Sequence, residues 1–241
     1  MDDYNFLNIP DSCFIGSTIY KKLFYENANL SSSDKHLFTD IINKIVWLYC
    51  LKPETINIPV YKDEVREYPE IEVIEVILNK EYGLNRIAEI IMRTIPYPML
   101  LIFKLEDKIR FYMAHQRTSQ SDSSKNTIEE FISTDWLSND SALFAKLDIK
   151  QMRFTNFYTL YSDIVDAISI YNLSAIMPTD DTVTGAKARE LSAKIEDIEQ
   201  RIANLRSKLK KETQFNRKME LNIEIKRLEQ SKNKLLGGDN E

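Results

Sequence analysis

Three glutamates and a lysine near the middle of the chain have the chemistry that metal-dependent cleavage requires. Glu70, Glu72 and Glu75 lie close together, and Lys80 follows them. Carboxylates that converge on one edge of a sheet hold divalent cations in nucleases, and a nearby ammonium group balances developing charge. The usual Glu-x-Lys spacing is absent here. A divergent metal-dependent nuclease is therefore an alternative hypothesis and not the leading one.

Glu75 is the strongest single candidate, because its neighbours are apolar. In a strand it faces the same side as Val73 and Ile77. A carboxylate in apolar surroundings has a raised pKa and can serve as an acid, a base or a ligand. The alternative is a structural carboxylate that faces solvent or pairs with a nearby Lys or Arg.

His115 is a weaker catalytic candidate, at the predicted end of a strand, with Arg117 two residues further on. Functional residues often gather where strands meet loops, but a surface or edge histidine explains the position equally well. No serine or cysteine has a nucleophile motif, and the glycines do not form a phosphate-binding loop. Cys13 and Cys50 lack metal-ligand spacing. We expect no metal and no cofactor, and we lean away from catalysis.

Basic residues cluster in a predicted turn near the C-terminus, with an aromatic residue among them. Between positions 206 and 218, Glu212 is the one acidic residue. Basic charge beside an aromatic ring suits phosphate contact and base stacking, so DNA or RNA binding is a second alternative. The structural alternative is a solvent-exposed helix face, with the aromatic ring packed over the end of the hairpin. The predicted nucleic-acid-binding residues are Lys208, Lys210, Lys211, Phe215, Arg217 and Lys218.

Two helices must position this turn. Apolar residues at four-three spacing run from Leu191 to Leu209, and a second stripe begins out of step at Leu221. In one straight helix the two stripes would lie on different sides, so we predict an antiparallel coiled-coil hairpin over 186–236. A heptad stripe packs against a facing helix. We expect helices of roughly 25 and 20 residues, joined by a turn near 210–216. The seam residues predicted to bind a partner are Ile198, Ile202, Leu205, Leu221, Ile225 and Leu228.

The first 177 residues predict an α/β body, with a small mixed β-sheet flanked by helices. Residues 70–78 are apolar on both faces of a strand, which is typical of an interior strand. A helix over 84–95, a hairpin of 99–105 with 109–115, and a strand over 127–133 follow. We also predict helices over 17–27, 141–147 and 154–176, and one that runs from about 34 to 51. Residues 55–60 are predicted to be extended, and 118–126 to form a polar surface loop.

Composition sets the domain limits and the location. We predict a body over 1–177, a linker over 178–185, the hairpin arm over 186–236 and a disordered tail over 237–241. The arm has 14 Lys and Arg against 8 Asp and Glu, whereas residues 1–185 have 18 against 27. This asymmetry favours nucleic acid or an acidic partner. Two cysteines and no membrane-length apolar run predict a cytoplasmic protein with no membrane association.

Five short motifs occur in order along the chain: Trp47 with 51–58, 95–98, 114–117, 133–137 and 214–222. Together they resemble the bacterial domain-of-unknown-function family 4391. Gln116 departs from the pattern, because a basic residue is expected there. The resemblance implies no activity; it implies gene neighbourhoods with helicases and DNA methyltransferases, as in restriction-type defence loci.

These observations together predict a non-catalytic accessory or adaptor subunit of a nucleic-acid-processing complex, of the anti-phage defence or restriction type. The arm would dock a protein partner, such as a helicase or methyltransferase-type subunit. A homo-oligomer through the arm is a further alternative. Heptad seams express a helix-packing need directly, so protein docking ranks above nucleic-acid binding.

Overall fold

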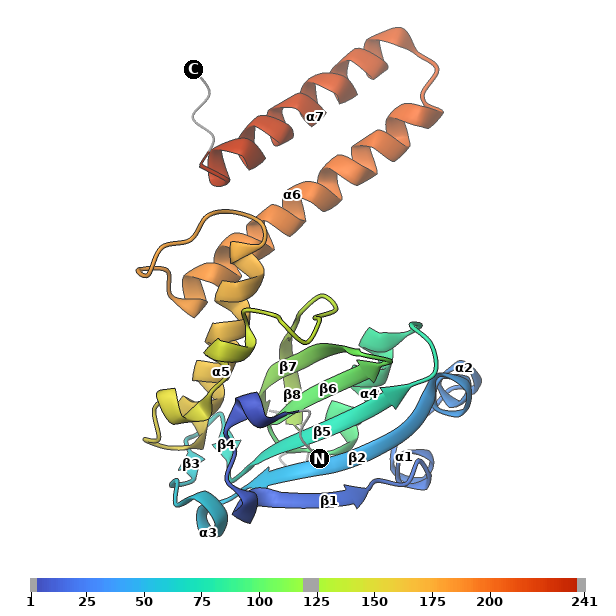
Figure 1. The fold of residues 1–241 in the computed structure, drawn as a ribbon. Coiled ribbons are helices and arrows are strands. Elements are labelled where there is room, and N and C mark those ends of the chain that lie inside the picture. Colours follow the sequence, from blue (N-terminus) through green and yellow to red (C-terminus); the bar gives the residue numbers. More distant parts are fainter. Residues whose placement is uncertain (1–3, 119–125, 238–241) are drawn as a thin grey trace. The chain divides into compact units, whose positions relative to one another are not determined.

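The computed structural model describes residues 4–118 and 126–237 (Figure 1). Two compact units divide the chain, residues 1–168 and 169–241. The predicted boundaries at 178 and 186 both fall inside the second unit, and the division into body, linker and arm stays a prediction. The polar loop predicted for 118–126 lies outside the described residues, apart from its two end residues, as does the predicted disordered tail beyond residue 237.

The first unit is built on a six-stranded mixed sheet, which confirms the predicted fold class. Its order is β1-β2-β5-β6-β7-β8, and every neighbouring pair is antiparallel except β5 and β6. The parallel pair needs a crossover, which α4 (Leu84–Thr94) supplies. A separate two-stranded ribbon joins β3 (Tyr61–Lys62) to β4 (Glu67–Tyr68). The strands of the large sheet are β1 (Phe14–Thr18), β2 (Ile42–Leu51), β5 (Ile71–Leu78), β6 (Met99–Leu105), β7 (Lys108–Thr118) and β8 (Asn126–Ser133).

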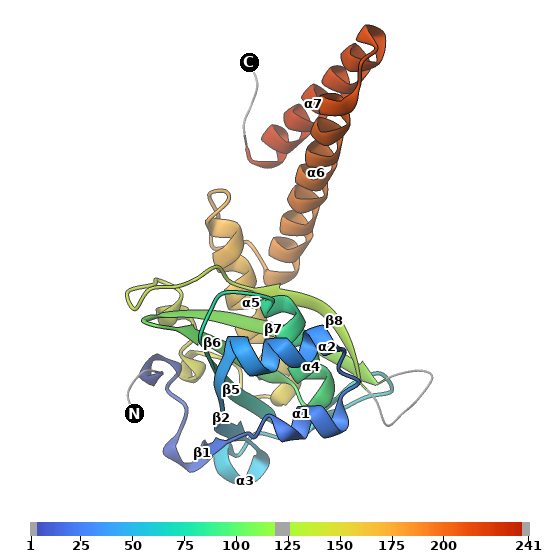
Figure 2. The same ribbon diagram turned by 90° about the vertical axis from the view of Figure 1, so that its right-hand side faces the viewer.

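Strand β5 is the interior strand that the sequence predicts. It lies between β2 and β6, and seven of its eight residues are buried. Helices α1 (Lys22–Asn27), α2 (Ser32–His36) and α4 cover one face of the sheet (Figure 2). Side chains from that face of β5, such as Ile74 and Val76, pack with Ile87 and Ile91 of α4 in one apolar core. The two-sided burial explains why this strand is apolar in both registers.

The helix predicted from about 34 to 51 is wrong for most of its length. The chain is α-helical over α2 and forms one π-helical turn over Leu37–Ile41, and then it becomes strand β2. The stretch from Ile42 to Leu51 is rich in β-branched and aromatic residues, which fit a pleated surface. Pairing with β1 and β5 satisfies its backbone on both sides, so the sheet overrides the helical spacing.

The other predictions of local secondary structure were confirmed in some segments and wrong in others. The strand over 127–133, the 99–115 hairpin and the helix over 84–95 are confirmed by β8, β6 with β7, and α4. The helix predicted over 17–27 is wrong at its start, because residues up to Thr18 belong to β1. Extended structure is wrong at 55–56, which end the short helix α3 (Pro53–Ile56). In place of the helix predicted over 141–147 there is only a 3-10 turn, Phe144–Lys146. Helix α5 covers Phe157–Ser174, within the helix predicted over 154–176. Further 3-10 turns are Asn5–Leu7, Asp11–Cys13 and Ile149–Gln151.

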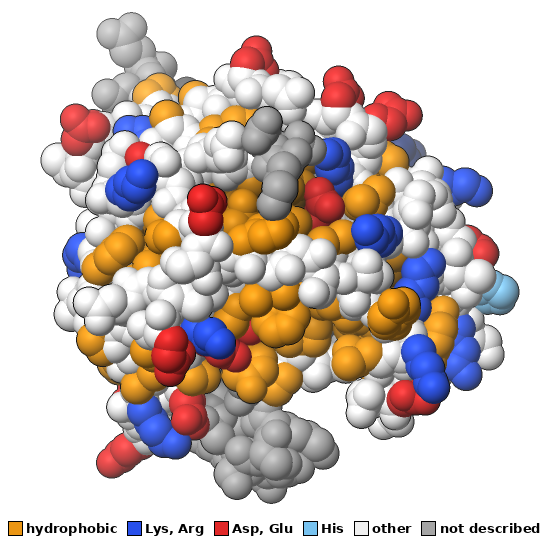
Figure 3. Space-filling view, turned by 60° about the horizontal axis from the view of Figure 1, so that its bottom comes forward, with side chains coloured by type: hydrophobic (Ala, Val, Ile, Leu, Met, Phe, Trp, Pro, Cys, Tyr) orange, Lys and Arg blue, Asp and Glu red, His pale blue; other side chains and the backbone are white. Residues whose placement is uncertain are grey.

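The edge of the sheet at β1 exposes apolar side chains. Phe14 and Ile15 of β1 and Leu23 and Tyr25 of α1 are all partly open to solvent. Figure 3 views the face at the bottom of Figure 1, where hydrophobic side chains form several patches with charged side chains between and around them. Scattered patches of this kind are normal for a protein surface.

The second unit contains the predicted helical hairpin. Helix α6 (Gly185–Lys211) and helix α7 (Phe215–Leu235) pack together across a turn at 212–214. Thr184 caps α6, because its Oγ1 accepts the N–H of Lys187 at 3.2 Å. The observed lengths of 27 and 21 residues match the predicted 25 and 20. The break in apolar phase between Leu209 and Leu221 therefore marks a real turn.

Candidate functional site

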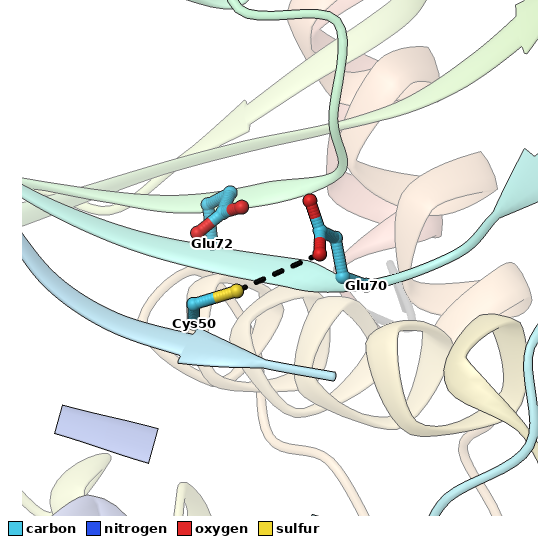
Figure 4. Close-up of side chains that lie close together, drawn as sticks. All are labelled: Cys50, Glu70 and Glu72. Carbon is cyan, nitrogen blue, oxygen red and sulfur yellow. Dashed lines mark hydrogen bonds between the residues drawn. The ribbon is translucent and has the colours of Figure 1, made fainter. Parts of the chain in front are cut away.

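A thiol and two carboxylates meet on the helix-covered face of the sheet, at the end of β2 and the start of β5 (Figure 4). Cys50 lies opposite Glu72 in the β2–β5 register. Glu70 precedes the strand, and its Oε2 lies 3.6 Å from the Cys50 Sγ, which donates to it. One ligand atom from each residue lies within 4.8 Å of the others. Three ionisable groups therefore share one small volume.

Burial controls the charge of this cluster. Only 3% of Glu72 is exposed, and its carboxylate accepts a hydrogen bond from the indole N–H of Trp47. Burial, reinforced by the nearby Glu70, raises the pKa of Glu72 from 4.5 to about 7. The same burial and both glutamates raise the pKa of Cys50, so the thiol stays protonated at neutral pH. A protonated, buried thiol is a hydrogen-bond donor and a poor nucleophile.

The donor set decides which ion this cluster would accept. One sulfur with two carboxylate oxygens suits a borderline cation such as Zn²⁺ better than Mg²⁺, which prefers oxygen alone. Binding would require proton loss from Cys50, against its raised pKa. Within the cluster the Cys50 thiol donates to Glu70, and the Trp47 indole donates to Glu72. Sequence reasoning missed the cluster because it placed Cys50 in a helix, far from any strand register.

The residues of the nuclease hypothesis do not form one cluster. Glu70 and Glu72 come together, but Glu75 lies on the opposite face of β5, as strand alternation requires. There its Oε1 accepts the Tyr4 hydroxyl at 2.6 Å, and both side chains are buried. Lys80 is exposed beyond the last residue of β5. Metal-dependent cleavage by this set stays a prediction.

His115 lies on β7 in a group of aromatic side chains. Its Nδ1 is 2.7 Å from the hydroxyl of the buried Tyr68. The same hydroxyl accepts the Gln116 backbone N–H at 3.2 Å. Tyr158 and Tyr161 pack against the ring. The buried Gln116 donates to the Tyr97 carbonyl at 3.0 Å. The surroundings of His115 are those of a packed, hydrogen-bonded side chain.

The hairpin seam holds its own two helices together. Ile202, Leu205, Ile225 and Leu228 are buried against one another, with Ile198, Leu209 and Leu221 packed around them. All six residues predicted to bind a partner belong to this core. Whether they also bind a partner stays a prediction, and side chains outside the seam are more open to a direct contact.

Helix α7 has such side chains on its outer side. Phe215, Met219 and Ile223 are 73%, 48% and 48% exposed. Their spacing of four residues places them in one row, which we call the outer stripe. At 100° per residue the row is on the side of α7 away from the buried Ile225 and Leu228. Sequence reasoning singled out Phe215 but missed the row, because it looked only for the seam.

The predicted basic residues surround the turn of the hairpin. Lys208, Lys210, Lys211, Arg217 and Lys218 are all exposed, on the last turn of α6 and the first turn of α7. Glu212 accepts the N–H groups of Thr213 and Gln214 at 2.8 Å each, which fixes the turn. We call these five cations with Phe215 the basic tip. The structure brings together all six residues that the sequence assigned to nucleic-acid binding.

The family described as a domain of unknown function (DUF4391) matches residues 7–231, nearly the whole chain. The chain belongs to this family. The resemblance carried by the five sequence motifs is thereby confirmed. None of the curated proteins and none of the solved structures matches this DUF4391 chain. Among the described residues, no helix is long and apolar enough to cross a membrane.

Proposed function

We propose that this protein is a non-catalytic accessory or adaptor subunit that docks a protein partner through the hairpin of α6 and α7. The outer stripe carries the proposal. Apolar side chains in a row on a helix normally pack against another element, as the seam residues do. Phe215, Met219 and Ile223 instead face solvent, and exposed apolar rows of this kind mark protein contacts.

The first unit supports a role without catalysis. Its best-placed carboxylate, Glu75, is bound to the Tyr4 hydroxyl, and the Cys50 thiol is protonated at neutral pH. A carboxylate that is already hydrogen-bonded and a thiol that is protonated lack the activated atom that general-base or nucleophilic chemistry needs.

We infer a nucleic-acid-processing assembly of the restriction or anti-phage defence type, with a helicase or methyltransferase-type subunit as the partner. The basic arm and the gene neighbourhoods implied by the family resemblance support it. We place the protein in the cytoplasm, because both cysteines are free and buried.

The test is purification of the tagged full-length chain from its native host, with bound proteins identified by mass spectrometry. We expect a defined partner with the wild type and its loss when Met219→Glu and Ile223→Glu put two charges into the outer stripe. Asn204→Glu with Ser207→Glu adds the same charge on exposed positions of α6 and serves as the control. If the stripe variant retains the partner, or the control loses it equally, the stripe is not the docking surface.

A further inference from the structure

Among the described residues, ion pairs engage several cations along the shaft of the hairpin. Along the shaft, Arg206 binds Glu229 at 2.7 Å, Lys232 binds Glu199, and Lys187 binds Glu190 at 3.1 Å. By contrast, none of the five cations of the basic tip forms an ion pair within the described part of the chain. Glu212 attracts Arg217 and Lys218 without forming an ion pair, so positive charge at the tip remains available to an external anion.

The same five cations are also close together in space. Lys208, Lys211 and Arg217 line one hollow of about 460 Å³ at the turn, and Glu212, Glu220 and Glu224 line it with them. Lys210 and Lys218 are exposed on the adjoining turns of the two helices. The one acidic side chain within the tip, Glu212, already accepts two backbone N–H groups. A chain of phosphates crossing the tip would meet cations from both helices.

Phe215 determines which kind of anion fits. Its ring is 73% exposed at the first position of α7, between Lys211 and Arg217 in sequence. An apolar ring gains by stacking on a flat, unpaired base, and single strands offer such bases whereas a duplex keeps them stacked inside. We propose that the basic tip binds single-stranded nucleic acid, with phosphates on the five cations and one base on Phe215. This site shares Phe215 with the outer stripe, and its five cations lie outside the protein docking surface proposed above.

The salt dependence of binding gives a quantitative expectation. Each phosphate neutralised on a single strand contributes about −0.7 to the slope of log K against log salt concentration. Five contacts therefore give a slope of about −3.5. Replacing Lys210 and Lys211 by Gln should reduce it to about −2. Removing a stacked ring by Phe215→Ala should weaken binding about 5- to 150-fold and leave the slope unchanged.

The experiment is fluorescence anisotropy with the purified full-length chain and a labelled oligothymidylate of about 15 nucleotides, the site size of a short single-strand groove. The matched control is Lys226→Gln with Lys234→Gln, which removes the same charge from exposed positions further along α7. Circular dichroism verifies that each variant keeps its helices. We expect the tip variants to lose affinity while the control stays close to the wild type.

Three results would overturn the proposal: no salt-sensitive binding by the wild type, equal loss in the tip and shaft variants, or full affinity in Phe215→Ala. Preference for a duplex of the same length would also overturn it, because Phe215 would then have no exposed base. If the tip variants instead lose a protein partner but bind the oligonucleotide normally, the tip is a docking surface for an acidic protein. Protein docking through the outer stripe is tested by Met219 and Ile223, so the two proposals can fail separately.

Discussion

The buried carboxylate Glu72 should make the stability of the first unit depend on pH near neutrality. Its pKa rises from 4.5 to about 7 on folding because burial penalises the charged form. Between those values the folded chain binds a proton that the unfolded chain releases. The free energy of unfolding therefore contains a contribution that is complete below about pH 4.5 and is lost as the pH rises through about 7.

The size of this effect follows from the shift. A rise of about 2.5 pKa units, at about 1.4 kcal/mol per unit, corresponds to about 3 kcal/mol between pH 4.5 and pH 8. The substitution Glu72→Gln removes the titration and keeps the shape, since the amide oxygen can still accept the Trp47 N–H. We expect the variant to gain about 3 kcal/mol relative to the wild type across this pH range.

Urea denaturation followed by tryptophan fluorescence is the assay, because Trp47 and Trp136 both belong to the first unit. Glu64→Gln is the control: this side chain is exposed next to the β3–β4 ribbon, and its replacement should give a difference near zero at every pH. Parallel stability curves for the wild type and Glu72→Gln would refute the reasoning, as would a difference that grows toward acid.

Two further predictions concern elements that the structure makes distinct. Ile225→Ala should destabilise the hairpin by about 2–4 kcal/mol, because the side chain is only 7% exposed in the seam, whereas Ile223→Ala should cost little; hydrogen exchange of α7 compares them directly. Asp34 closes a capping box with Ser31 and accepts two bonds from Arg86 at 2.8 and 2.9 Å, which hold the pKa of Asp34 below its usual value. Its contribution is thus present at neutral pH and lost in strong acid. Asp34→Ala should lower the free energy of unfolding by about 1 kcal/mol at pH 7, measured by thermal melting. This difference should shrink progressively as the pH falls below about 4, the pKa of an unfolded Asp.

Elements whose apolar residues follow one clear pattern were predicted correctly from the sequence. The four-three spacing of the arm needs a facing helix, and the phase break before Leu221 leaves only a turn, so the hairpin follows directly. Strand β5 and helix α4 also follow, because a short run that is apolar on both faces and an amphipathic 3.6-residue period each suit only one environment. The six residues of the basic tip are neighbours in sequence around one turn, so their grouping required no long-range contact.

Only the tertiary structure decided the features that depend on distant partners. Residues 42–51 have apolar spacing compatible with a helix, and hydrogen bonds to β1 and β5 make them a strand. That choice brings Cys50 opposite Glu72 and places Glu75 on the other face, which local spacing cannot reveal. Two ion pairs of the shaft likewise join residues 23 and 33 positions apart, Arg206 with Glu229 and Lys232 with Glu199, so only the fold shows that these cations are paired. The sequence by itself determined the apolar period of the arm and of β5 and α4, and the charge of the arm, since these are local properties. The tertiary structure decided which side chains are buried and which are paired, because burial and pairing depend on the residues that folding brings alongside.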